Sequence, residues 1–356
     1  MPRPARSTIF NIIKYRRMDR FAYPLAHFLE VVPARLASRR STFVPYMPVA
    51  IYFDVTTACN LRCEMCALHT LPKREFARYL SFDNFKKILD QVPCHQMRHV
   101  EIPGRGEPLL NPDLTKMLSY ARERGFTTAL YTNGTLIDEN NVKDLVMYLD
   151  RIHFSVDGAI KETYEGIRKG ADFDKVMDNI SMFIDVNKTR PKMYRVRTYI
   201  NFVCSKLNYS EIVGIINLAH KLQVNAVTIT MARKMYPGKR LSEYDEKIRE
   251  LQKLSYQSVL NSLTKAYKLS EKYRISFSFQ PLKSTVQECV WPWVRLFVTY
   301  DGFVVPCCLI ADPSIINFGN VFHEPLKRIW NNSQYQKFRR ELMSKDPPTV
   351  CARCGL

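Results

Sequence analysis

The stretch Cys59-Asn-Leu-Arg-Cys63-Glu-Met-Cys66 places three cysteines within eight residues, directly after an apolar run that predicts a strand over Val49–Val55. A short loop with three thiolates can hold one corner of a [4Fe–4S] cluster and leave its fourth iron open. A structural zinc site needs four ligands, and His69 is a residue that could complete such a set. We follow the cluster interpretation, because an open metal position is what the binding of a small molecule requires.

Downstream of these cysteines, short apolar or β-branched runs alternate with amphipathic helical stretches, a pattern typical of βα units and a parallel sheet. Five further strands are predicted at His99–Ile102, Thr127–Tyr131, Arg151–Val156, Val196–Val203 and Ala226–Thr230. Helices are predicted near residues 82–92, 113–124, 139–149, 174–187 and 209–222, with Ser81 and Asp138 as N-cap residues. The expected fold is α/β, an open, TIM-like (β/α)6 partial barrel whose ligands bind beyond the carboxyl ends of the strands.

Short polar motifs follow the second, third and fourth predicted strands. They are Gly104-Arg-Gly106-Glu107-Pro108, Thr132-Asn133-Gly134 and Ser155-Val-Asp157-Gly158. Glycine lets the backbone approach a ligand closely, and the carboxylate of Glu107 can pair with a cation. One such motif alone mostly marks a turn, but their order after successive strands indicates a shared ligand site.

The cysteine triplet and these motifs together resemble the radical S-adenosylmethionine (AdoMet) superfamily over roughly residues 49–235. The resemblance implies that Cys59, Cys63 and Cys66 bind a [4Fe–4S] cluster whose open iron chelates AdoMet. Reduction of that cluster would generate a 5′-deoxyadenosyl radical that abstracts hydrogen from a substrate C–H bond. The residues implied to contact AdoMet are Met65 at the adenine, Glu107 at the ammonium, Arg168 at the carboxylate, and Gly104, Gly106, Asn133, Ser155 and Asp157 nearby.

Four further cysteines lie near the C-terminus, at Cys289, Cys307, Cys351 and Cys354. Four thiolates can complete a zinc site or hold an iron–sulfur cluster. Their order, with the spacing Gly302-x4-Cys307 and a final CxxC pair, resembles the SPASM/twitch extension of radical AdoMet enzymes. No cysteine follows Cys354, so we expect the shortened twitch type with one auxiliary [4Fe–4S] cluster. Cys307 is favoured over its neighbour Cys308 as a ligand because it keeps the spacing.

The chain divides into four expected regions. Residues 1–48 are a basic arm, because residues 1–45 carry nine Lys or Arg against only Asp19 and Glu30. The arm predicts an amphipathic helix interrupted at Pro24, which either packs on the main domain or lies on a membrane surface. The partial barrel occupies 49–240, a helical linker with one long helix over Ser242–Tyr273 and a last strand occupies 241–280, and the auxiliary domain occupies 281–356.

Composition restricts the class of protein. The 356 residues contain no signal-peptide pattern and no apolar run of membrane-spanning length, so we expect a cytoplasmic protein, with membrane association through the arm as a further option. Ten cysteines in such a chain favour metal sites over disulfides. The net charge of +19 favours an anionic partner without identifying it. A non-catalytic iron–sulfur or zinc protein that binds nucleic acid is the alternative class, and the intact cofactor motifs argue against it.

Two residues after the fifth and sixth strands bear on the reaction. Cys204 could face the barrel mouth and return a hydrogen atom to the substrate, although a buried strand-end cysteine is the alternative. Arg233 could anchor an anionic or hydroxylated substrate. We favour dehydrogenation of a small sugar-, cyclitol- or lipid-type metabolite, as in the aminocyclitol dehydrogenases with a twitch domain, with electron transfer to the auxiliary cluster. The alternatives are an epimerase and a peptide maturase acting on a ribosomal precursor. Each would need an external electron donor such as flavodoxin or ferredoxin.

Overall fold

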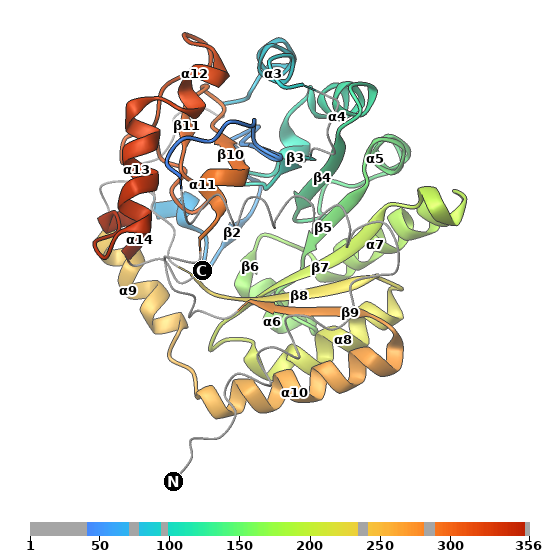
Figure 1. The fold of residues 1–356 in the computed structure, drawn as a ribbon. Helices are drawn as coiled ribbons and strands as arrows, with labels where there is room; N and C mark the ends of the chain where they lie inside the picture. The colour runs from blue at the N-terminus through green and yellow to red at the C-terminus, as the bar shows by residue number, and fades with distance from the viewer. Residues whose placement is uncertain (1–40, 71–77, 94–98, 234–240, 281–288, 353–356) are drawn as a thin grey trace.

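The computed structural model describes residues 41–70, 78–93, 99–233, 241–280 and 289–352. In this part the chain forms a nine-stranded sheet in the order β11-β10-β1-β3-β4-β5-β7-β8-β9. Neighbouring strands are parallel except for the antiparallel pair β10 and β11. The sheet curves, and helices cover its outer side (Figure 1). The strands are β1 (Ala50–Phe53), β3 (His99–Ile102), β4 (Thr127–Thr132), β5 (Arg151–Ser155), β7 (Arg197–Cys204), β8 (Ala226–Met231), β9 (Ser276–Gln280), β10 (Arg295–Val298) and β11 (Val304–Val305).

A second, two-stranded sheet and the helices complete the fold. The small antiparallel sheet joins β2 (Arg62–Cys63) to β6 (Arg168–Lys169). The α-helices are α3 (Phe82–Leu89), α4 (Leu114–Glu123), α5 (Val142–Tyr148), α6 (Lys161–Ile167), α7 (Phe173–Lys188), α8 (Ile212–Lys221), α9 (Leu241–Leu251), α10 (Tyr256–Tyr273), α11 (Trp291–Val294), α12 (Leu326–Trp330), α13 (Ser333–Met343) and α14 (Thr349–Ala352). Short 3₁₀ turns lie at Ala67–Thr70, Pro108–Leu110, Lys192–Tyr194 and Tyr209–Glu211.

The predicted α/β partial barrel is confirmed. All six predicted strands occur in order and pair as a parallel sheet, and the five predicted helices lie between them. Helix α6 was not predicted. In the described residues the edge strands β11 and β9 do not pair with each other, so the barrel stays open.

The two faces of the sheet differ in chemistry because strand side chains alternate. On the outer face, Phe53 packs against Phe85 of α3 with ring centroids 4.6 Å apart, and Phe154 packs against Phe183 of α7 at 5.6 Å. The register then places the alternate residues on the inner face. They are largely polar or aromatic: Tyr52, Glu101, Tyr131, Arg151, His153, Ser155, Arg197, Tyr199, Asn201, Thr228, Ser278 and Arg295.

One N-cap prediction was wrong, and the helical stretch expected over Ser242–Tyr273 is divided into two helices, α9 and α10. It breaks where Gln252 Nε2 donates to the Ala232 carbonyl at 2.7 Å and Ser255 then caps α10. The N-cap residue of α5 is Asn141, because Asp138 instead accepts the Asn141 N–H at 3.0 Å in the preceding turn.

The other predicted N-cap is confirmed. Ser81 Oγ caps α3 by accepting the Asn84 N–H at 3.3 Å.

The C-terminal region shares the main sheet. Strand β10 pairs in parallel with β1, with Ala50 beside Arg295, so residues 289–352 extend the barrel edge. The described end of the N-terminal arm crosses this region, where Val44 exchanges two hydrogen bonds of 2.9 and 2.7 Å with the Asn331 side chain, and Trp330 Nε1 donates to the Tyr46 carbonyl at 2.8 Å. Residues 1–40, on which the amphipathic-helix prediction falls, lie outside the described residues. None of the described helices is both long and apolar enough to cross a membrane.

Candidate active site

The first three cysteines lie on the loop after β1, which the small sheet holds in place. Cys63 is paired in register with Arg168, and the Cys66 N–H donates to the Cys63 carbonyl at 3.1 Å. The Leu61 N–H lies 3.5 Å from Cys59 Sγ. Burial raises the pKa of Cys59 to about 11 and that of Cys63 to about 12, and the nearby Cys66 contributes to both shifts. The three thiols are thus near enough to influence one another's pKa, and they need a positive partner, such as iron, to be deprotonated.

Arg168 and Asp157, both predicted AdoMet contacts, form a buried ion pair. Arg168 Nη2 lies 2.6 Å from Asp157 Oδ2, and Asp157 Oδ1 accepts the Val203 N–H at 2.6 Å. Arg168 Nη1 points at Cys63 Sγ, 3.7 Å away. Burial opposes the charge of Arg168, but Asp157, Cys63 and Tyr164 together outweigh it and raise the pKa of the guanidinium. Arg168 therefore joins Asp157 to the cysteine loop, and its contact with the AdoMet carboxylate stays a prediction.

Glu107 is a buried carboxylate at the end of the glycine-rich motif, 2% exposed. Its Oε1 accepts from the Thr132 hydroxyl at 2.7 Å and from the Leu109 N–H at 3.2 Å, and its Oε2 accepts from the Asn133 N–H at 2.8 Å. Burial raises the pKa of Glu107, and these hydrogen bonds offset part of the rise. Within the described residues no basic side chain forms an ion pair with it. A buried carboxylate without a cation fits the ammonium group of AdoMet.

The two glycines of this motif sit where a side chain would not fit. Gly104 has φ +67°, and a Cβ there would lie 2.8 Å from the Tyr131 carbonyl oxygen. At Gly106 a Cβ would lie 2.2 Å from the Ala58 carbonyl oxygen, which also accepts the Glu107 N–H at 2.7 Å. The motif therefore packs backbone against backbone on the segment that leads into the cysteine loop.

Gly106→Ala is expected to displace that segment. Because the obstructing atoms are backbone, relief must move Ala58 and with it Cys59, so iron content and AdoMet binding should fall at least severalfold and unfolding should become about 1–3 kcal/mol more favourable. Iron assay, equilibrium dialysis with AdoMet and urea unfolding measure these effects. Gly166→Ala is the matched control, because a Cβ there meets nothing within 4 Å. Wild-type iron and AdoMet binding in Gly106→Ala would contradict the argument.

Asn133, Ser155 and Met65 occupy different places around the cysteine loop. Asn133 Nδ2 donates to Asn60 Oδ1 at 2.9 Å, which joins the third motif to this loop. Ser155 ends β5 on the inner face, beside Asn201 in register, and is partly exposed. Met65 packs beside the small apolar cluster formed by Ala67, Ala232, Tyr244, Ile248 and Leu251. All three lie at the carboxyl ends of the strands, as the motifs predict, and their contacts with AdoMet stay predictions.

Cys204 does not face the inside of the barrel. It is fully buried and alternates on β7 with Ile200 and Phe202 on the helix-covered face, whereas Arg197 and Tyr199 face inward. The register Phe154–Ile200 fixes this assignment, because Phe154 packs on α7. Burial raises the pKa of Cys204 to about 12. The expectation that its side chain faces the barrel mouth is thus corrected, and the alternative of a buried strand-end cysteine holds.

Arg233 follows β8 and is partly exposed. Its Nη2 lies 3.5 Å from the Gln280 carbonyl, and its own carbonyl accepts the Tyr244 hydroxyl at 3.4 Å. The same hydroxyl lies 3.2 Å from the Met65 carbonyl, so Arg233 is tied to the cysteine loop. The structure places it near the site, and its role in anchoring a substrate stays a prediction.

The second group of cysteines gathers around β11. Cys307 is buried, and its backbone carbonyl accepts the Ile310 N–H at 3.1 Å. Burial raises the pKa of the Cys307 thiol, and Cys308 and Cys289 lie near enough to raise it further. Cys351 is also buried, while Cys354 lies outside the described residues.

Cys307 and Cys308 have different surroundings. Cys308 lies near enough to Tyr52 and Arg295, on the inner face of the barrel, to raise the pKa of both groups. Cys307 is instead near Tyr335, packed among the apolar residues of the C-terminal region. This difference favours Cys307 as the cluster ligand.

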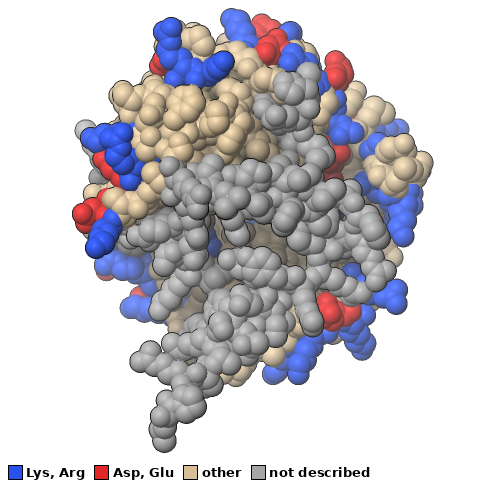
Figure 2. Space-filling view, in the orientation of Figure 1, with Lys and Arg blue, Asp and Glu red and all other residues tan. Residues whose placement is uncertain are grey.

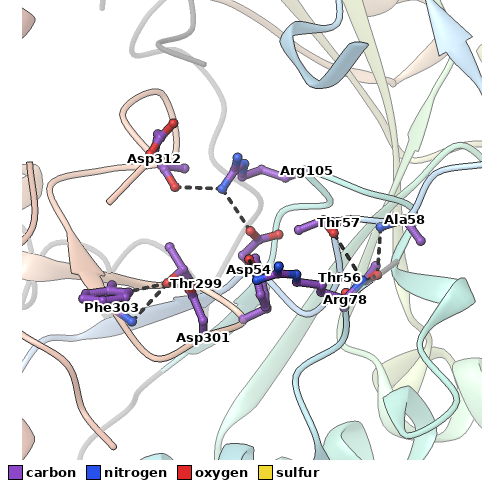
Figure 3. A network of polar contacts seen from close by, with 12 residues as sticks. Asp54, Thr56, Thr57, Ala58, Arg78, Arg105, Thr299, Asp301, Phe303 and Asp312 are labelled. Carbon is purple, nitrogen blue, oxygen red and sulfur yellow. Dashed lines mark hydrogen bonds and ion pairs between the residues drawn. The ribbon is translucent and has the colours of Figure 1, made fainter. Parts of the chain in front are cut away.

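Arg105, the residue between the two glycines of the glycine-rich motif, makes a link that the sequence did not reveal. Figure 3 shows it between Asp54, which follows β1, and the C-terminal region. Its Nη1 lies 3.0 Å from Asp54 Oδ2 and donates to the Ala311 carbonyl at 2.7 Å. Asp54 is 1% exposed, so the ion pair is largely buried. The motif that carries Glu107 is therefore tied to the segment just after Cys307. The one feature of the sequence that could have indicated this link is the presence of a charged residue, Arg105, in a glycine-rich turn.

Comparisons with known proteins agree with this arrangement. A family model described as the Radical SAM superfamily matches residues 53–219, and one described as the SPASM iron-sulfur cluster-binding domain matches residues 289–355. The tungsten-containing aldehyde ferredoxin oxidoreductase cofactor-modifying protein of Pyrococcus furiosus is 26% identical over 86% of this chain and 87% of its own. The AdoMet-dependent heme synthase of Methanosarcina barkeri is 25% identical over 87% and 88%.

Solved structures share the fold. Streptococcus suis SuiB bound to S-adenosylmethionine superimposes with a TM-score of 0.67 at 15% identity, over 94% of this chain and 84% of SuiB. The residues that gather here fit the cofactors of this family, namely AdoMet with its [4Fe–4S] cluster at the first cysteine group and auxiliary iron–sulfur chemistry at the second. The chain therefore belongs to the radical SAM superfamily and carries a C-terminal iron–sulfur cluster-binding SPASM domain.

Proposed function

We propose that this radical SAM enzyme dehydrogenates a small sugar-, cyclitol- or lipid-type metabolite, with one auxiliary [4Fe–4S] cluster as the electron acceptor. The observation that carries the proposal is the position of the two cysteine groups on one sheet. Cys59 follows the carboxyl end of β1, whereas β11 runs back antiparallel to β10 and brings Cys307 toward the end where Arg295 lies. On this proposal, the inner face of the barrel lies between the AdoMet site at Cys59, where hydrogen would be abstracted, and the auxiliary-cluster site at Cys307, which would accept an electron.

The polar character of the inner face supports a polar substrate. Ser155, Asn201, Thr228 and Ser278 form one row across four neighbouring strands. Ser278 Oγ donates to Thr228 Oγ1 at 3.1 Å, and such hydroxyl and amide groups can also bond to substrate hydroxyls. Figure 2 shows Lys and Arg side chains around the outer rim of the molecule in this view, interspersed with Asp and Glu.

The protein's part in the reaction is binding, orientation and exclusion of water. When bound, the reduced cluster and AdoMet supply a 5′-deoxyadenosyl radical that removes one hydrogen atom from a substrate C–H bond. Glu107 would hold the AdoMet ammonium group, and the Arg168–Asp157 pair would orient the cysteine loop beside it. Cys307 and the neighbouring Cys289 would hold the auxiliary cluster, which would supply an acceptor for one further electron. With the released proton passing to solvent, the substrate would be oxidised by two electrons, and an external donor such as flavodoxin or ferredoxin would supply the electron that each turnover needs.

Peptide maturation is the second candidate. A structure of SuiB bound to its precursor peptide SuiA has the same fold, with a TM-score of 0.66. An epimerase is less well supported, because Cys204 points away from the inner face. If a thiol donates hydrogen, Cys308 is better placed, since it lies near Tyr52 and Arg295 on the inner face. A cytoplasmic location and contact of the basic arm with a membrane remain proposals.

Reconstitution tests the cofactor part of the proposal. Anaerobically reconstituted protein should contain about eight irons per chain, four for each of two clusters. It should also form 5′-deoxyadenosine from AdoMet under reducing conditions. About four irons with one zinc would contradict the auxiliary cluster.

The reaction type is tested with candidate substrates that stimulate 5′-deoxyadenosine formation. Turnover in deuterated water should give a ketone or aldehyde without solvent deuterium at the reacting carbon. Deuterium retained at that carbon in a product of unchanged oxidation state would instead identify an epimerase.

A further inference from the structure

The inner face of the barrel carries more cations than carboxylates. Its described strands place Arg151, Arg197 and Arg295 inward, and Glu101 is the one carboxylate among the inward residues of those strands. Glu101 is already engaged, because Arg151 Nη2 lies 2.7 Å from its Oε1. The space between the two cysteine groups is therefore positively charged.

Arg295 has no carboxylate of its own on the inner face, because Glu101 pairs with Arg151. Its guanidinium lies 4.9 Å from the Trp291 ring and 5.9 Å from the Tyr52 ring. In the described part of the chain it makes no hydrogen bond or ion pair; the nearby Glu101 helps to raise its pKa, but that carboxylate is paired directly with Arg151. Burial raises the pKa of Tyr52, so this phenol stays neutral and cannot serve as the counter-ion. Aromatic contacts compensate only part of the lost hydration of a guanidinium, which leaves it suited to an anion.

An uncharged aromatic column lies on the inner face two residues further along β5 and β7 than Arg151 and Arg197. His153 is stacked between Tyr131 and Tyr199, with ring centroids 4.1 and 4.3 Å apart. Burial lowers the pKa of His153 to about 3, so the ring is neutral at physiological pH. Tyr131 and Tyr199 are partly exposed, whereas His153 is 8% exposed. The column offers a flat apolar edge beside the arginines.

We propose that the inner face binds an anionic group of the substrate, a carboxylate or a phosphate, at Arg295, with the flat part of the substrate against the Tyr131–His153–Tyr199 column. The inference rests on the proposed function only in taking this inner face as the substrate site. It identifies the substrate class as an anionic metabolite and assigns the recognition of its charge to a residue of the SPASM region.

Anion binding to the reconstituted holoenzyme tests this directly. With AdoMet at saturation to fill the cofactor site, equilibrium dialysis with labelled benzoate and, separately, labelled phosphate should detect about one saturable site per chain for at least one of them. Benzamide, which has the same ring without the charge, should not compete. Arg295→Gln should weaken anion binding at least tenfold, and Arg328→Gln, an exposed arginine of α12, should leave it unchanged.

The two anions distinguish the source of the charge. Binding of benzoate alone indicates a substrate carboxylate, and binding of phosphate alone indicates a substrate phosphate.

If Arg295→Gln fails to fold, the fluorescence of Trp291, whose indole lies beside Arg295, gives a second measurement. Binding of either anion should change the tryptophan emission of the wild type but not that of Trp291→Phe. No binding of either anion, or binding of equal strength in Arg295→Gln, would overturn the inference. AdoMet cleavage, which tests the proposed function, would be unaffected by that result.

Discussion

Cys63→Ala is expected to reduce 5′-deoxyadenosine formation from AdoMet to below detection. The variant removes one of three thiolates, and two remaining ligands cannot hold the cluster with its fourth iron open. It also removes the sulfur that Arg168 Nη1 approaches at 3.7 Å. The measurement is chromatographic detection of 5′-deoxyadenosine under dithionite, together with the iron content of the reconstituted protein. Iron should fall by about half, because the second cysteine group is intact.

Cys204→Ala is the matched control for this substitution. Both cysteines are on the same domain, but Cys204 is fully buried on the helix-covered face of β7. Its loss should lower stability by about 1 kcal/mol and leave iron content and AdoMet cleavage unchanged. If Cys63→Ala still forms 5′-deoxyadenosine, the assignment of the first cluster is wrong. If Cys204→Ala abolishes cleavage, our description of its surroundings is wrong.

The sequence predicted the barrel and the cofactor motifs well because both are local patterns. Each strand is a short apolar run, and each motif follows its strand within a few residues. Cys204 shows where a local signal was available but was not used. On β7, Arg197, Tyr199 and Asn201 alternate with Ile200 and Phe202, so counting by two from either set assigns the cysteine to the apolar face.

Other features could not be predicted because they depend on pairings between distant residues. The pairing of β10 with β1 joins positions 245 residues apart, as Ala50 and Arg295 show. The contact of Arg105 with Ala311 spans 206 residues. The periodicity of apolar residues in the sequence does not indicate which distant strands pair with each other. The excess of arginine on the inner face likewise emerges only when the register aligns residues from separate strands.

Arg168→Met is expected to have the largest effect on stability. It leaves Asp157, which is 0% exposed, as a buried charge without its cation, and breaking a buried pair in this way costs about 3–5 kcal/mol. Urea unfolding under anaerobic conditions measures the change. Arg122→Met is the matched control, because Arg122 also pairs with a carboxylate at 2.6 Å, that of Asp150, but both side chains are about a third exposed. Its loss should cost less than about 1 kcal/mol.

The double variant Arg168→Met with Asp157→Asn separates stability from function. It removes both charges and keeps a side-chain oxygen that can accept the Val203 N–H, so much of the lost stability should return. AdoMet binding should not return with it, because the guanidinium beside Cys63 is still missing. If the double variant recovers both stability and AdoMet binding, Arg168 serves only to neutralise Asp157. If it recovers stability alone, the arginine contributes to the cofactor site itself. Arg168 can both neutralise Asp157 and contact the cysteine loop because it lies opposite Cys63 on the small sheet.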